Sequence, residues 1–168
     1  KTFATPILTN CALADMLPWR KVSSLPFELA CVPQRFYNRL NLPVVSYAIP
    51  ALVAVGQAKF HHAPPRNPLV RWIRSAALKR SLKILEQMQP ASGGYLEATP
   101  LTSFVVMSLA SIGLSEHIVV RRGVEFLLAS VREDGSWPID TNLATWNTSQ
   151  ALTALELGTD DEDHSDSY

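Results

Sequence analysis

The chain has 168 residues, 47% of them hydrophobic, which is enough for one compact domain with a continuous core. Fifteen Lys and Arg balance fifteen Asp and Glu, so no net charge would draw nucleic acid, and we expect no nucleic-acid partner. Cys11 and Cys31 lie in apolar surroundings without disulfide-framework or metal-site spacing, which favours buried thiols and a cytoplasmic location.

The first half of the sequence predicts two helices joined by an irregular connector. Apolar residues at helical spacing predict a short helix over 5–16, and because residue 1 is not Met we expect a piece of a longer protein. Residues 17–43 contain four prolines, which predicts an irregular proline-rich connector. Residues 44–57 are apolar nearly all round and predict a buried helix that ends at Gly56. The connector should be fixed to the body by its aromatic rings, which are Trp19, Phe27, Phe36 and Tyr37.

The second half predicts further helices and a polar tail. Prolines and the adjacent His61 and His62 predict a surface loop over 61–68, since two histidines without a third ligand make no metal site. Helical periodicity predicts helices over 70–89, 101–113, 117–131 and about 145–157, and no strand is expected. The helical domain should therefore cover 1–158, followed by an acidic linker or disordered tail over 159–168.

Two charged stretches need an interpretation. The acidic run over 160–163 is interpreted as solvated linker rather than a magnesium site, because no helical pattern follows it. Residues 59–83 carry basic side chains and no acid, which we interpret as a solvated helix face, with a basic patch as the alternative. These basic residues are Lys59, Arg66, Arg71, Arg74, Lys79, Arg80 and Lys83.

An internal repeat organises the second half. A shift of the sequence by 42 positions superimposes Leu85 on Leu127, Gln89 on Val131, Gly93 on Gly135, Tyr95 on Trp137 and Phe104 on Trp146. Each unit reads as a helix, a glycine turn with an aromatic ring, and a second helix, which is typical of stacked helix-pair repeats. We expect Gly135 to take a positive φ and Trp137 to fold back and fill the gap between neighbouring units.

Residues 122–137 resemble the QW repeat of squalene-hopene and oxidosqualene cyclases. The motif elements are carried by Arg122, Gly123, Phe126, Gly135 and Trp137, whereas Val131 stands where the motif has Gln. The earlier copy keeps Gln89 but has Gly93 and Tyr95 in place of the Gly-x-Trp end. Residues 25–33 resemble the proline-rich connector of the bacterial cyclases, and 144–148 resemble the Pro-Val-Trp-Asp-Thr start of an inner helix. The resemblance covers about residues 3–157.

The resemblance implies an all-α fold, a partial α/α toroid of antiparallel helix pairs around an apolar cavity for a C30 isoprenoid such as squalene. It also implies the remainder of the parent toroid as a partner and peripheral membrane contact through the parent. Trp146, Phe104 and Tyr47 are candidate cavity aromatics by this resemblance, with core packing as the alternative. In the family an Asp-x-Asp-Asp-Thr acid starts cyclisation, but this chain lacks it, so we assign no catalytic residue and expect the piece alone to be inactive.

Two other functions stay open. One is a non-catalytic helical-repeat module that binds a lipid or a protein partner. The other is a protein prenyltransferase subunit, which would need zinc ligands that the histidines and cysteines do not supply, so we expect no metal and no cofactor. An apolar flank left by missing repeats makes self-association of the piece an expectation under either function.

Three acidic residues stand in structured contexts. Glu28 lies in an apolar, proline-rich stretch, where we expect it to accept backbone hydrogen bonds or to pair with an arginine such as Arg35, with a catalytic role as the alternative. Glu97 and Asp140 follow the two glycine turns and are expected to cap the next helices or to bind the turn backbone.

Overall fold

The computed structural model describes residues 4–33 and 49–162, and within them the fold is all-α, as predicted. This part has no strand, only an isolated antiparallel bridge between Ala98 and Asp140. The α-helices are α1 (Ala4–Leu13), α3 (Ile49–His62), α4 (Pro68–Met88), α5 (Thr99–Ala110), α6 (Ile118–Ala129) and α7 (Ala144–Glu162). The short 3-10 helices are η1 (Trp19–Lys21), η2 (Phe27–Cys31) and η4 (Tyr95–Glu97). Predictions for Arg35, Phe36, Tyr37, Tyr47 and 163–168 lie outside the described residues.

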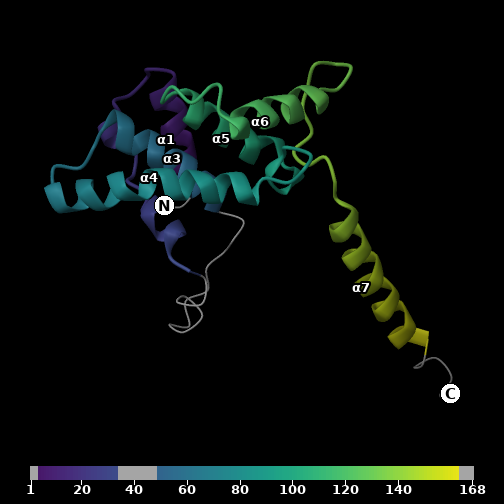
Figure 1. Ribbon diagram of the computed structural model, residues 1–168. Coiled ribbons are helices and arrows are strands. Elements are labelled where there is room, and N and C mark those ends of the chain that lie inside the picture. Colours follow the sequence, from purple (N-terminus) through teal and green to yellow (C-terminus); the bar gives the residue numbers. More distant parts are fainter. Residues whose placement is uncertain (1–3, 34–48, 163–168) are drawn as a thin grey trace.

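The body is built around two central helices, α3 and α5, which pack against each other (Figure 1). Helix α4 packs on α3, and α6 packs on α5, so the outer helices flank the central pair. The 3-10 helix η2 lies against both α3 and α4. The core where these helices meet includes Val53, Leu85, Tyr95, Val105, Leu109 and Val119. Burial of such side chains contributes about 1.5–3 kcal/mol each to folding.

The predicted end of α3 at Gly56 is wrong, because the helix continues to His62. Gly56 lies inside the helix, where an added Cβ would be only 2.9 Å from the Cβ of Phe27. The glycine therefore admits the ring of Phe27, which is fully buried and fixes the connector to the body as predicted. His61 and His62 are helical and not part of a loop, and the next helix begins after Asn67, whose side chain accepts from the Leu69 backbone N–H at 2.9 Å.

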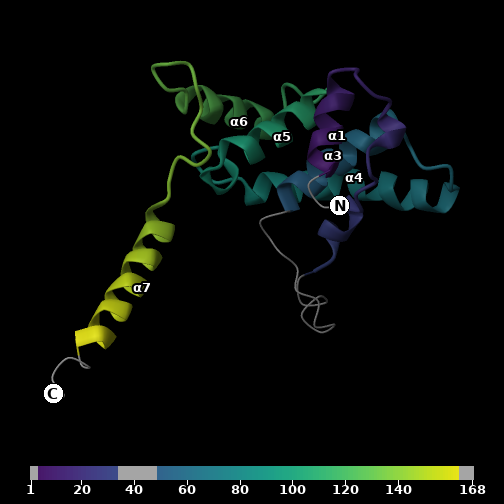
Figure 2. The ribbon, with the colours of Figure 1, turned by 180° about the vertical axis from the view of Figure 1, so that it is seen from behind.

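Helix α7 extends away from the body, as Figures 1 and 2 show from opposite sides. It runs on to Glu162, so a linker that starts at residue 159 is wrong for 159–162. The 42-residue shift offers a physical reason for its position. The core residues Val105 and Leu109 of α5 correspond to Asn147 and Ala151 of α7, which have little apolar surface to bury. The side chains over 147–155 are all exposed.

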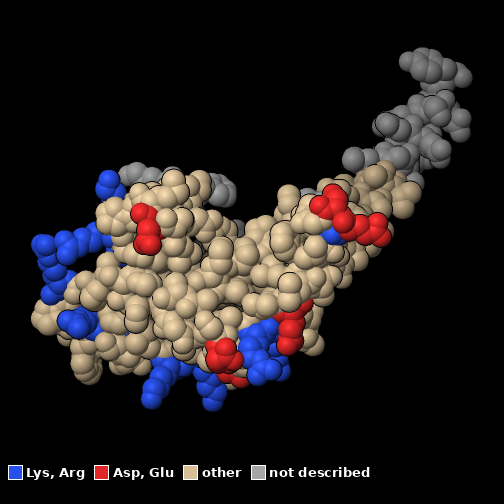
Figure 3. Space-filling model, turned by 90° about the horizontal axis from the view of Figure 1, so that it is seen from above, with Lys and Arg blue, Asp and Glu red and all other residues tan. Residues whose placement is uncertain are grey.

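The basic stretch over 59–83 is not a uniformly solvated face. Arg71 and most of its neighbours are exposed, but Lys59 and Arg74 are each only 7% exposed, so the prediction is wrong for these two. Arg74 Nε lies 3.2 Å from Glu28 Oε1, which supplies the arginine partner that was expected for Glu28. Figure 3 shows the Lys and Arg side chains mainly along the left and lower edges of the body. None of the described helices combines the length and apolarity that a membrane span requires.

Candidate functional site

Of the three aromatic residues proposed to line a cavity, only Phe104 has a side chain that the structure describes. Phe104 is partly buried on α5, inside the helical body. Trp146 lies on α7, which extends away from that body, and its side chain lies outside what the structure describes, as does all of Tyr47. These predictions therefore remain without a structural test.

The first glycine turn, at residues 93–95, and the second, at residues 135–137, contain the same hydrogen bond 42 residues apart. Tyr95 Oη donates to the Leu85 carbonyl oxygen at 2.8 Å, and Trp137 Nε1 donates to the Leu127 carbonyl oxygen at 2.7 Å. Each ring thus reaches back ten residues into the last turn of the preceding helix. The Leu127 carbonyl oxygen also accepts from the Ser130 backbone N–H at 3.2 Å, so in both turns the aromatic side chain adds a hydrogen bond to a carbonyl group at the end of the preceding helix.

The first turn is closed by α6. Gly93 has a φ of 87°, and an added Cβ would lie 2.9 Å from the carbonyl carbon of Arg122 and closer still to its oxygen. Gly94 meets the ring of Phe126 in the same way. On α6, an added Cβ at Gly123 would be 2.5 Å from Val106 Cγ2. Gly93 and Gly94 thus allow the turn to lie close against α6, and Gly123 allows α6 to lie close against α5.

Gln89 ties the first turn to α6 by two hydrogen bonds. Its Nε2 donates to the Gly93 carbonyl oxygen and to the Val119 carbonyl oxygen, both at 3.0 Å, and the residue is only 8% exposed. Position 131 in the second unit holds Val, which cannot make either bond and is 39% exposed. In the first unit, Gln89 therefore links the turn to α6 through hydrogen bonds from one side chain.

The second turn is open. Gly135 has a φ of 79°, as expected, but an added Cβ would meet nothing within 4 Å. Trp137 folds back onto α6 yet remains 51% exposed, so the prediction that it fills a gap between units is wrong. In the described part of the chain, no helix covers this turn as α6 covers the first, which leaves the indole face in solvent.

Backbone hydrogen bonds join the two turns to each other. Thr99 N donates to the Ile139 carbonyl oxygen at 3.0 Å, and Thr141 N donates to the Glu97 carbonyl oxygen at 2.8 Å. The Glu97 carboxylate accepts from Ser92 Oγ and from Thr141 Oγ1, so it binds turn side chains and does not cap α5. The Asp140 backbone forms the isolated bridge to Ala98, and its expected side-chain role as a cap or turn ligand stays a prediction.

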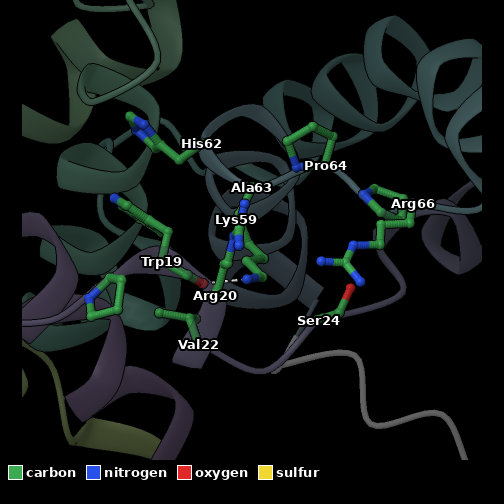
Figure 4. A pocket seen from close by; sticks show the side chains of 11 residues that line it. Trp19, Arg20, Val22, Ser24, Lys59, His62, Ala63, Pro64 and Arg66 are labelled. Carbon is green, nitrogen blue, oxygen red and sulfur yellow. Dashed lines mark hydrogen bonds between the residues drawn. The ribbon is translucent and has the colours of Figure 1, made fainter.

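A pocket of about 720 Å³ lies where the start of the connector meets the end of α3 (Figure 4). It is lined by residues from the η1 region, from the last turn of α3 and from the loop before α4. Its cationic and imidazole side chains are Arg20, Lys59, His62 and Arg66, and none of the described residues that line it is Asp or Glu. Its apolar wall includes Pro18, Trp19, Val22, Pro64 and Pro65.

Lys59 is the most buried of these charged groups. Its Nζ donates to the Trp19 carbonyl oxygen, the bond drawn dashed in Figure 4. Burial lowers the pKa of Lys59, and the nearby Arg20 lowers it further. Burial also lowers the pKa of His62, and its neighbour His61 adds to the effect, against smaller opposing contributions from Ser111 and Asp15. Both shifts mean that positive charge is unfavourable at these two positions.

The Trp19 ring stacks on His62, with ring centroids 4.5 Å apart and planes 17° from parallel. This stack positions the side chain that was expected to fix the connector to the body. The sequence indicated a basic stretch but not the pocket, because the lining segments are far apart in the chain and meet only through tertiary packing. The absence of acid over 59–83 was the one signal available.

A second, smaller pocket of about 270 Å³ lies between α3, α4 and the loop that follows α5. Its lining is mainly apolar and includes Phe60, Leu78, Leu82, Ile112 and Leu114. Phe104 lines neither of these two pockets. Within residues 4–33 and 49–162, no group of three or more His, Cys, Asp or Glu side chains could hold a metal ion. Both cysteines are free and partly buried, and burial raises the pKa of Cys31.

Comparison with known proteins found no match: no family model fits the chain, and no curated protein or solved structure is similar to it.

Proposed function

We propose that the chain is a helix-pair segment of a squalene-hopene-cyclase-like protein, in which it contributes part of the wall of an apolar cavity for a C30 isoprenoid. The observation that carries this proposal is the recurrence of the ring-to-carbonyl hydrogen bond at Tyr95 and Trp137. The bond recurs at the spacing of the QW-like motif, and stacked repeats build their shared core from such equivalent units.

The packing of α5 supports the same proposal. It lies between α3 and α6, with an outer helix on each side of the central pair, as in an arrangement of inner and outer helices. Phe104 on α5 and Trp146 on α7 hold equivalent positions in the two units. In the complete protein their rings would stabilise carbocations through their π faces, whereas the acid that starts the reaction would come from elsewhere in the parent.

The test is incubation of the complete parent protein with squalene in detergent, followed by mass spectrometry of the extracted lipids. We expect cyclised isomers, formed about two- to thirtyfold more slowly after Phe104→Leu or Trp146→Leu, since a cation over an aromatic face is stabilised by about 0.5–2 kcal/mol. Leu128→Ala, at a 67% exposed position on α6, is a control and should leave the rate unchanged. Unconverted squalene with a folded parent would rule out cyclisation.

A non-catalytic helical-repeat module that binds a lipid or a protein is the second candidate. The open second turn favours it, because Trp137, Ile139 and Leu143 leave apolar surface exposed in this turn and in the segment that follows it. A further repeat of the parent would cover this surface, and an isolated piece would instead self-associate. Analytical ultracentrifugation of the chain should show concentration-dependent dimers, which the charge-introducing variant Ile139→Glu should abolish. A strictly monomeric chain would contradict the self-association.

A further inference from the structure

We propose that the pocket between the connector and the end of α3 binds a phosphate monoester that carries an apolar substituent. This ligand is distinct from the isoprenoid proposed above, since Phe104, the one proposed cavity aromatic whose side chain is described, does not line the pocket. The inference rests on four features: an excess of positive charge, a buried ammonium with unused donors, an apolar wall, and a volume that suits a small organic molecule.

The charge of the lining is one-sided. Arg20, Lys59 and Arg66 come from three different segments and converge on one pocket, and its lining within residues 4–33 and 49–162 contains no carboxylate. Nearby acids do not offset them directly. Glu28 is engaged with Arg74, which also donates to Ser24 Oγ at 2.6 Å, and Asp15 influences His62 without lining the pocket. Like charges held together repel, so the arrangement lacks a partner of opposite sign.

The Lys59 ammonium is the buried cation of the pocket and has hydrogen-bond donors that a ligand could use. The residue is 93% buried, and its ammonium has three N–H donors, of which the Trp19 carbonyl oxygen takes one. A cation in such a place is costly unless an anion compensates it. Figure 4 shows Lys59 and Arg20 near the centre of the view, with Arg66 and Ser24 grouped to one side. An anion between these groups would accept charge-assisted hydrogen bonds from both sides.

A structural role alone does not explain why Arg20, Lys59 and Arg66 line one pocket. Basic residues in the last turn of α3 complement the helix dipole, and the Lys59 bond to Trp19 fixes η1 to the helix. That role needs only Lys59. It does not explain why Arg20 of η1 and Arg66 of the next loop line the same space, where each adds repulsion.

The charge and the wall select the ligand class. A phosphate monoester carries about −1.5 to −2 charges near pH 7, so it offsets more of three cations than a single carboxylate does. The prolines at 18, 64 and 65, with Val22 and the Trp19 ring, offer apolar surface beside the charges. An apolar substituent on the ester would lie against this surface, and the 720 Å³ volume lies within the range of small-molecule sites.

The experiment is a calorimetric titration of the full chain with phenyl phosphate, and in a second arm with phosphatidylcholine vesicles that contain phosphatidic acid. We expect saturable binding at one site per chain. Arg20→Gln and Arg66→Gln should each weaken it by on the order of tenfold, because each removes a charge-assisted hydrogen bond. Both side chains are exposed, so these variants should fold normally. Lys59→Met should abolish binding and also tests the buried donor.

Arg71→Gln is the matched control, since it removes the same charge from an exposed position on α4 outside the pocket. It should change the affinity by less than about twofold at physiological salt, where distant surface charges are screened. Binding in the phenyl phosphate arm identifies a soluble ester, and binding in the vesicle arm alone identifies a lipid headgroup, and either supports the proposal. No saturable binding in either arm would overturn it, as would equal losses from Arg71→Gln and Arg66→Gln.

Discussion

The glycines at 93 and 135 have the same backbone conformation but different surroundings, which separates backbone strain from packing. Alanine at either position must adopt a positive φ, at a cost of about 1–2 kcal/mol. At Gly93 the new Cβ would also run into the Arg122 carbonyl group, and this atom cannot yield unless α6 moves. Overpacking of this kind costs a further 1–3 kcal/mol or so, so Gly93→Ala should lower the free energy of unfolding by about 2–5 kcal/mol.

The measurement is urea unfolding followed by far-ultraviolet circular dichroism, with the free energy of unfolding extrapolated to water. Gly135→Ala should cost only the strain, about 1–2 kcal/mol. Gly113 has a φ of 83° with nothing within 4 Å, so Gly113→Ala is a matched control and should cost the same as Gly135→Ala. Equal losses at 93 and 135, with unchanged m-values, would refute the contact between α6 and the first turn.

Three further predictions concern the two turns and Lys59. Tyr95→Phe leaves the buried Leu85 carbonyl oxygen without its partner and should lower the free energy of unfolding by about 1–3 kcal/mol. Trp137→Phe exposes a carbonyl to water and should lower it by less than about 1 kcal/mol. Urea unfolding measures both, and equal losses would contradict the difference in burial. Gln89→Leu removes the hydrogen bonds to the Gly93 and Val119 carbonyl oxygens and should lower the free energy of unfolding by about 2–4 kcal/mol in the same assay. An unchanged free energy of unfolding would argue against the link between the turn and α6. Burial raises the pKa of Tyr95, so above about pH 10 the unfolded chain releases a proton that the folded chain keeps, and the free energy of unfolding should fall by up to about 1.4 kcal/mol per pH unit. The pKa of Lys59 is lowered, so Lys59 contributes a free energy of unfolding that rises with pH and is complete near pH 10.5. The fall in the free energy of unfolding above this pH should therefore flatten in Tyr95→Phe and persist in Lys59→Met.

Local patterns predicted the helices and the turns well, because both depend on residues close together in the chain. The period of apolar residues located α4 and α6 to within two residues at either end. The 42-residue shift paired Gly93 with Gly135 and Tyr95 with Trp137, and these pairs share φ and hydrogen-bond geometry. Glycine and ring chemistry act within ten residues, which is the range that sequence patterns capture.

Errors arose where distant segments decide the outcome. Gly56 suggested a helix end, but it is there to admit Phe27, which lies 29 positions earlier in the chain. Lys59 belonged to a stretch interpreted as solvated, but packing of η1 over α3 buries it. Helical patterns alone did not predict that α7 would extend from the body, although the polar Asn147 in place of Val105 was a signal. The basic pocket depends on the same long-range packing and could not be derived from spacing.

The repeat requires that Trp137 make the hydrogen bond that Tyr95 makes, although its ring is half exposed. Hydrogen exchange of the indole N–H protons by nuclear magnetic resonance tests this, with Trp72 as the reference because it is 70% exposed on α4. If Trp137 donates to the Leu127 carbonyl oxygen, its indole proton should exchange about tenfold or more slowly than that of Trp72. Equal exchange rates for the two indoles would show that the second turn lacks the bond and that the two units are not equivalent.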